Sequence, residues 1–76
     1  MDGINIEELI VKLGKRICDL RKEFDMTQLD LAVKSNIDER QIQRLENGHT
    51  SPTLKTLLKL ANGFGITLSK LLEFEK

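Results

Sequence analysis

The sequence predicts an all-α fold of five short helices, and three observations support this. Apolar residues recur at steps of three and four positions, and no strand-like alternation extends beyond a few residues. Asn, Thr or Asp, which are the residues that cap helix N-termini, precede each apolar periodic stretch. Only one residue is proline, Pro52. A chain of 76 residues is long enough for one domain, which we expect to span residues 1–76.

The first predicted helix is capped by Asn5 and runs to about Glu23. A glycine in its interior, Gly14, costs about 1 kcal/mol relative to alanine. We therefore expect Gly14 to mark a place of close packing. The apolar positions of this helix fall on one stripe, which consists of Ile6, Leu9, Ile10, Leu13, Ile17, Leu20 and Phe24.

Four more helices follow. Thr27 is the expected N-cap of the second, with Asp30 in the position of a capping-box partner. That helix spans residues 28–35 and is expected to bury Leu31 and Ala32. The expected N-caps of the last three are Asp38, Thr53 and Thr67. The third helix is expected to run to Asn47, with Gly48 ending it; the fourth from Leu54 to about Phe64, closed by Gly65; and the fifth from Leu68 to Glu73.

Composition argues against an enzyme and against a metal or cofactor. The chain has a single cysteine, Cys18, and a single histidine, His49, so neither a disulfide nor a zinc site can be assembled. One histidine gives no set of nucleophile, base and orienting group, and the sequence has no glycine-rich phosphate loop or evident small-molecule site. We expect Cys18 to be a passive side chain.

The charge pattern neither requires nor excludes nucleic acid. Net charge is zero, whereas the first 11 residues carry −3 and residues 12–59 carry +3. Acidic residues at the start argue against a signal peptide. No apolar run is longer than three residues, which argues against a membrane span. The expected location is the cytoplasm.

The predicted third helix has two distinct faces. At 100° per residue, Ile42 and Leu45 form a narrow apolar side that seats the helix on the core. Long polar side chains fill the opposite side, and Arg, Gln and Glu are residue types that can read base edges in the major groove. Polar outer faces are also common on surface helices, so the periodicity leaves both interpretations open. The polar set consists of Glu39, Arg40, Gln43, Arg44 and Asn47.

The sequence resembles the phage-repressor/Cro type of helix-turn-helix domain, also called the Xre family, over about residues 9–73. The resemblance depends most on Thr27-Gln28 and on the later run Arg44-Leu45-Glu46-Asn47-Gly48. It implies a compact five-helix, lambda-repressor-like fold with its helix-turn-helix unit at about residues 28–47. It also implies a homodimeric regulator of transcription that binds double-stranded operator DNA, such as a repressor.

The resemblance also implies roles for individual residues. Glu39, Arg40 and Arg44 match positions that read bases. Arg21 and Glu46 match an ion pair that ties the first helix to the third. Thr27 and Gln28 would contact the DNA backbone at a helix N-terminus, where phosphate is favoured. The remaining positions on or near the backbone are Gln43, Asn47 and His49, although a solvated loop histidine is equally compatible with the sequence.

Two turns and one helix depart from the family pattern. Asp25 and Asn36 occupy turn positions where the family commonly has glycine, so we expect strain or an adaptive side-chain bond there. Leu29 and Val33 are apolar where polar residues are usual. They are expected to contact the first helix or the N-terminal segment; a partner surface is the alternative. A protein-interaction module, such as an antitoxin that covers a toxin, is the competing function.

The C-terminal residues predict the dimer interface. A domain this small cannot bury all the apolar side chains that crowd into this segment. We expect the fourth and fifth helices, residues 54–73, to complete the core and to contact a second subunit. The alternative is that these side chains only complete the core of one chain. The expected interface residues are Ile66, Leu68, Leu71, Leu72 and Phe74.

Overall fold

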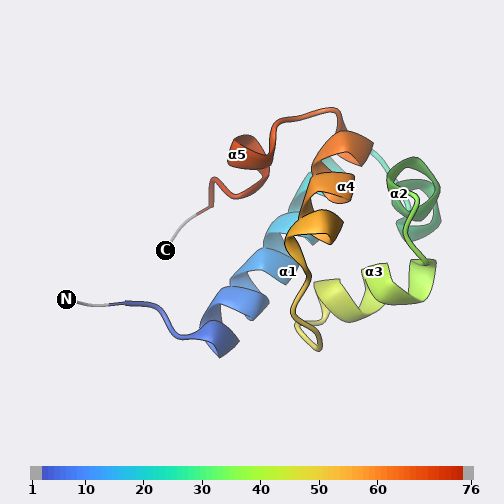
Figure 1. The fold of residues 1–76 in the computed structure, drawn as a ribbon. Helices are drawn as coiled ribbons and strands as arrows, with labels where there is room; N and C mark the ends of the chain where they lie inside the picture. Colours follow the sequence, from blue (N-terminus) through green and yellow to red (C-terminus); the bar gives the residue numbers. More distant parts are fainter. Residues whose placement is uncertain (1–2, 75–76) are drawn as a thin grey trace.

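The computed structural model describes residues 3–74, and these form five α-helices and no strand (Figure 1). The long helix α1 passes behind α4, with α2 and α3 to one side and α5 to the other. None of the helices in this part of the chain is long and apolar enough to cross a membrane. The helices are α1 (Ile6–Glu23), α2 (Gln28–Ser35), α3 (Glu39–Glu46), α4 (Leu54–Phe64) and α5 (Leu68–Leu71).

Local capping explains why the helices begin where they do, and the five predicted N-caps are confirmed. The side chains of Asn5, Thr53 and Thr67 each accept a hydrogen bond from the N–H three residues later, at 2.8–3.1 Å. The Asp38 carboxylate accepts from the N–H of Arg40 at 2.8 Å. Each bond satisfies a donor that the helix itself leaves free. The helix starts are therefore fixed by short-range chemistry.

The core lies where α1, α2, α3 and α4 meet, and α5 adds one residue to it. The predicted burial of Leu31 and Ala32 is confirmed, as is close packing at Gly14. A Cβ at Gly14 would meet the backbone carbonyl oxygens of Leu45 and Glu46, so glycine allows α1 to approach the end of α3. The buried apolar residues are Leu13, Ile17, Leu20, Leu31, Ala32, Ile42, Leu45, Leu60, Ala61, Phe64 and Leu71.

The predicted apolar stripe of α1 is only partly buried. Leu13, Ile17 and Leu20 belong to the core, whereas Ile6 is 52% exposed and Leu9 is 37% exposed. The reason is length, because α1 has 18 residues and its neighbours have 4 to 11. Its N-terminal turns therefore extend past the helices that could cover them (Figure 1).

The last helix is shorter than predicted, ending at Leu71 instead of Glu73. The side chain of Arg16, on α1, donates to the carbonyl oxygens of Lys70 at 2.8 Å and Leu71 at 3.2 Å. The Lys70 carbonyl also accepts from the N–H of Glu73 at 3.1 Å. A cation such as the Arg16 guanidinium is favoured at a helix C-terminus. Arg16 therefore fixes the end of α5 through a contact more than 50 residues away in sequence.

Candidate nucleic-acid interface

The turn between α2 and α3 holds the two helices at a fixed angle. Asn36 ends α2 in the left-handed conformation, with φ of 56°, and the N–H of Ile37 donates to the carbonyl of Ala32 at 3.0 Å. Asparagine adopts this conformation more readily than most residues. The expected departure from the usual glycine is thus tolerated at Asn36. Asp25, in the turn before α2, also has a positive φ, of 57°.

Helix α3 is seated by two apolar side chains and presents its other face to solvent. Ile42 is fully buried and Leu45 is 2% exposed. On the opposite side, Arg40 and Arg44 are exposed, and no side-chain hydrogen bond or ion pair engages either guanidinium within residues 3–74. The predicted polar face is completed by exposed Gln43 and Asn47 and by partly exposed Glu39.

A shallow groove runs beside this face of α3. It has a volume of about 370 Å³ and is lined by Asp38, Arg40, Gln41, Arg44 and Thr50. Two of these five residues are arginines, whose planar guanidinium groups each offer several donors. Such donors can form paired hydrogen bonds with O6 and N7 of guanine. The face can therefore contact base edges without breaking any bond within the chain.

The start of α2 carries a complete capping box. The Thr27 hydroxyl oxygen accepts from the N–H of Asp30 at 3.0 Å, and the Asp30 carboxylate accepts from the N–H of Thr27 at 2.9 Å. Hydrogen bonding to Thr27 lowers the pKa of Asp30, and the bond with the Thr27 backbone has a larger effect than the one with its side chain. Thr27 is exposed and Gln28 is half-buried, so both lie at the surface of this helix N-terminus.

An ion pair joins α1 to α3 directly behind this surface. Arg21 Nε donates to Glu46 Oε2 at 2.7 Å, and the two side chains are only 14% and 6% exposed. Arg21 also donates to the carbonyl of Met26 at 2.9 Å, which ties down the turn before α2. Its hydrogen bond with Glu46 is the main reason that the pKa of Arg21 is raised. The pair that the resemblance implied is present in the fold.

Comparison with known proteins decides the family. A family model described as helix-turn-helix matches residues 19–71. A control protein from Mycoplasma, C.MunI, is 33% identical over 67 residues, covering 87% of this chain and 90% of the relative. The transcriptional regulator DdrOP3 of Deinococcus deserti is 40% identical over 63 residues, covering 83% of this chain. This chain spans about half of that regulator, 49% of its length.

Solved structures agree with the sequence comparisons. The restriction-modification controller protein C.AhdI from Aeromonas hydrophila has a TM-score of 0.79 and 32% identity, over 82% of this chain and 94% of that one. The chain belongs to the helix-turn-helix family. The predicted all-α fold with five helices is confirmed, and α2 and α3 occupy the stretch predicted to be the helix-turn-helix unit.

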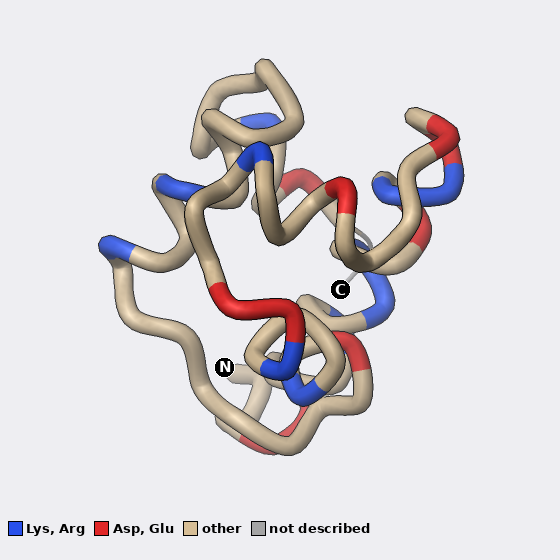
Figure 2. The backbone as a smooth tube through the Cα atoms, turned by 90° about the vertical axis from the view of Figure 1, so that its right-hand side faces the viewer, with Lys and Arg blue, Asp and Glu red and all other residues tan. Residues whose placement is uncertain are grey.

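Charge around the helix-turn-helix unit is mixed. Figure 2 shows Lys and Arg positions on several elements, interspersed with Asp and Glu.

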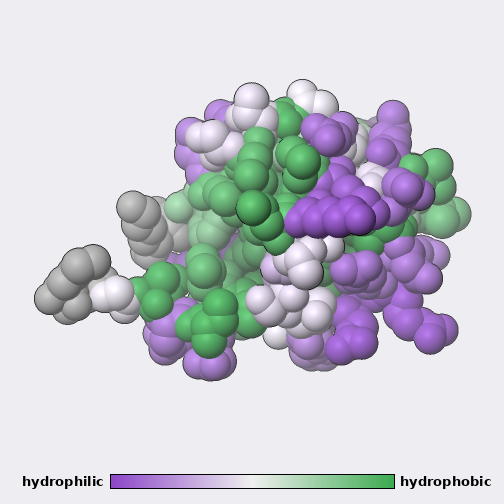
Figure 3. Space-filling model, in the orientation of Figure 1, coloured by the Kyte–Doolittle hydropathy of each residue, from purple (hydrophilic) through white to green (hydrophobic). Residues whose placement is uncertain are grey.

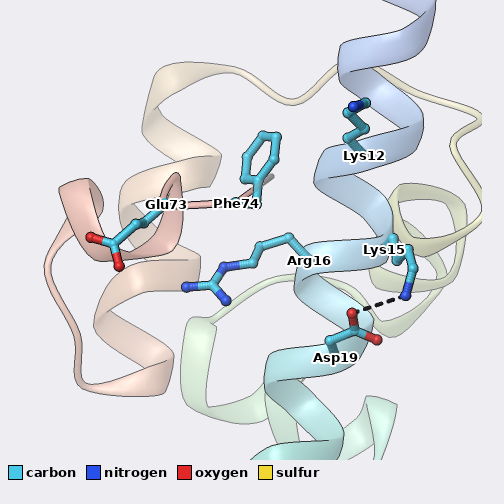
Figure 4. A pocket seen from close by; sticks show the side chains of 6 residues that line it. All are labelled: Lys12, Lys15, Arg16, Asp19, Glu73 and Phe74. Carbon is cyan, nitrogen blue, oxygen red and sulfur yellow. Dashed lines mark hydrogen bonds and ion pairs between the residues drawn. The ribbon is translucent and has the colours of Figure 1, made fainter. Parts of the chain in front are cut away.

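A second groove, of about 540 Å³, lies between α1 and the C-terminal segment, across the molecule from α3 (Figures 1 and 4). There Arg16 reaches toward α5, while Lys15 is paired with Asp19 at 3.1 Å.

The apolar pair on α2 does not pack as predicted. Leu29 is 55% exposed and Val33 is 73% exposed, so the expected contact with α1 or the N-terminal segment is wrong. Both side chains point outward because α2 turns its other side, with Leu31 and Ala32, to the core. The pair borders a shallow depression whose lining also includes Asp38. A partner surface remains a prediction.

The predicted dimer interface needs correction. Leu71 is fully buried in the core of this chain, so it cannot face a second subunit, and for this residue the alternative of core completion holds. Ile66, Leu68 and Phe74 are half-buried and pack against the core. Only Leu72, at 41%, is an exposed large side chain among the five. Exposed apolar residues that sequence reasoning did not place at an interface include two on α4, where Leu54 is 69% and Leu58 is 50% exposed.

Proposed function

We propose that this chain is a sequence-specific DNA-binding regulator of transcription that inserts α3 into the major groove. The supporting observation is the unengaged polar face of α3, fixed from behind by buried Ile42 and Leu45. A rigid helix with free donors on its outer face meets the geometric requirement for base readout. The relatives named as transcriptional regulators and control proteins support the same function.

Within this interface, residues divide by the groups they can reach. Arg40, Arg44 and Glu39 contact base edges from the exposed face of α3. Thr27 and Gln28 contact phosphate at the N-terminus of α2, where backbone N–H groups and the helix dipole favour an anion. Glu39 repels phosphates that are out of register, which narrows the range of sequences bound. The remaining backbone contacts come from Gln43, Asn47 and His49, all three of which are exposed.

The active form is a homodimer that pairs through an apolar face shared by α4 and the end of α5. The exposed apolar residues proposed for this interface are Leu54 and Leu58 on α4 and Leu72 at the C-cap of α5, which are 41–69% exposed. Figure 3 shows apolar surface over α4 and over the N-terminal part of α1 on the same side of the molecule. Apolar patches of this kind mark protein interfaces. A twofold dimer presents two α3 helices to half-sites about 34 Å apart.

Selection from a pool of random-sequence duplexes tests the DNA function. Recovered sites should contain two symmetric half-sites about 10 base pairs apart and should bind about 10³-fold or more tightly than random duplex at physiological salt. The double variant Arg40→Ala/Arg44→Ala should lose this binding. Lys15→Ala/Lys70→Ala removes the same charge from exposed ion pairs outside α3 and should largely retain it. Failure to enrich any sequence would refute the proposal.

Sedimentation equilibrium tests the dimer separately. Leu58→Lys should shift the protein to monomer and weaken operator binding, since a single half-site is then held alone. Val33→Lys introduces the same charge at a more exposed apolar residue, on α2, and should leave the dimer intact. Equal loss of dimer in both variants, or in neither, would contradict the proposed α4–α5 interface.

A further inference from the structure

A hydrogen-bond network links three helices through one buried carboxylate. Glu46 Oε2 accepts from Arg21 Nε at 2.7 Å. Glu46 Oε1 accepts twice, from an Arg21 terminal nitrogen at 3.2 Å and from Gln28 Nε2 at 3.1 Å. Arg21 belongs to α1, Gln28 to α2 and Glu46 to α3. The ion pair therefore has a third member at the N-terminus of α2.

The chemistry of this contact fixes the orientation of the Gln28 amide. An ionised carboxylate only accepts hydrogen bonds, so the amide must turn its nitrogen toward Glu46 and its oxygen away. The nitrogen then keeps its second N–H for another acceptor. Gln28 is the first residue of α2, where free N–H groups favour an anion. Its remaining donor is thus held beside the backbone donors of the same turn.

We propose that Glu46 is a positioning residue for DNA binding, which acts by holding the Gln28 amide in the orientation that donates to a phosphate. This rests on the proposed function, in which Gln28 contacts the DNA backbone. The Glu46 side chain is only 6% exposed, so it acts through Gln28 and has no contact of its own with the duplex. The ion pair with Arg21 joins the same carboxylate to α1.

The glutamine substitution at this position makes the proposal testable. In Glu46→Gln, the amide oxygen goes to the Arg21 donors, and the new NH₂ group faces Gln28. A donor in that place attracts the oxygen of the Gln28 amide and reverses its orientation. The phosphate then meets an oxygen where wild type offers an N–H. Loss of the Gln28 contact should therefore accompany loss of the Glu46 charge.

The experiment is a double-mutant cycle on DNA affinity. The probe is a duplex selected by wild-type protein, and the four proteins are wild type, Gln28→Ala, Glu46→Gln and the double variant. Gln28→Ala should weaken binding about tenfold in the wild-type background, as expected for one hydrogen bond to a charged group, and less than about twofold in the Glu46→Gln background. Arg21→Lys is the matched control, because it weakens the ion pair while keeping the Glu46 carboxylate, and it should leave the tenfold effect in place.

The outcomes separate the two proposals. If no duplex is selected, both the proposed function and this inference fail. If Gln28→Ala binds like wild type, DNA binding stands but the positioning role is wrong. If Gln28→Ala costs the same in both backgrounds, Glu46 only stabilises the fold. Should Glu46→Gln unfold, hydrogen exchange of the Gln28 side-chain amide in wild type decides: one protected proton in the free protein supports the proposal, and two rapidly exchanging protons overturn it.

Discussion

Replacement of Gly14 by alanine tests how α3 is held against α1. The added Cβ would lie 3.0 Å from the Glu46 carbonyl oxygen and closer still to that of Leu45. Both obstacles are backbone atoms, so no side-chain rotation relieves them. They also belong to the last turn of α3, which buried Ile42 and Leu45 anchor to the core. The last turn of α3 must therefore move away from α1. Otherwise the added methyl group clashes with these two carbonyl oxygens.

Two effects of opposite sign set the magnitude. Alanine gains about 1 kcal/mol over glycine in helix propensity, whereas overpacking of a tightly packed site costs about 1–3 kcal/mol. Because both contacts are to backbone, we expect the cost to lie at the upper end and Gly14→Ala to lose about 2 kcal/mol. A chain of 76 residues has a total free energy of unfolding of about 4–11 kcal/mol, so this loss is readily measured.

Urea unfolding followed by circular dichroism measures this loss. Gly3→Ala is a useful control, since no atom lies within 4 Å of the methyl group it adds, and its midpoint should be close to that of wild type. Operator affinity of Gly14→Ala should also fall, because the end of α3 carries Arg44 and Asn47. A variant as stable as wild type, with an unchanged slope in urea, would refute the close approach of α1 and α3.

Three other changes probe local features of the fold. Ser35→Ala should raise stability by about 1 kcal/mol in urea unfolding, because the buried Ser35 hydroxyl has no hydrogen-bond partner; a loss would mean that it does. Asp25→Gly should add about 0.5 kcal/mol by relieving a positive φ, and a lower midpoint would contradict that strain. The lowered pKa of Asp30 means that its contribution is complete above its ordinary value of 3.8 and is lost as pH falls through the folded pKa. The stability difference between wild type and Asp30→Asn should therefore shrink below about pH 3.8, and a difference that stays constant down to pH 2 would contradict the capping box.

The beginnings of the helices could be predicted because they depend on local chemistry. A cap such as Thr27 needs only its own hydroxyl and the N–H three residues ahead, both of which the sequence shows. The exposed face of α3 was also predictable, since the spacing of Ile42 and Leu45 fixes which side meets the core. The helix starts and the exposed polar face of α3 therefore follow from short-range patterns.

The features that escaped prediction depend on contacts between distant residues. The end of α5 is set by Arg16, and periodicity gives no sign of that bond. Gln28 and Glu46 are 18 residues apart on different helices, so their hydrogen bond appears only once three helices are placed. The burial of Leu71 and the exposure of Leu58 depend on how α4 and α5 pack, which an apolar segment alone does not specify.

The most direct test of the account is a base-pair substitution scan with Arg44→Ala. Affinities for a selected operator and for each of its single-pair variants should show that wild type discriminates at the contacted pair by about 1–3 kcal/mol, and that Arg44→Ala loses this preference at that pair alone. An equal loss on every duplex, random DNA included, would show that Arg44 supplies only charge and that the exposed face of α3 does not read sequence.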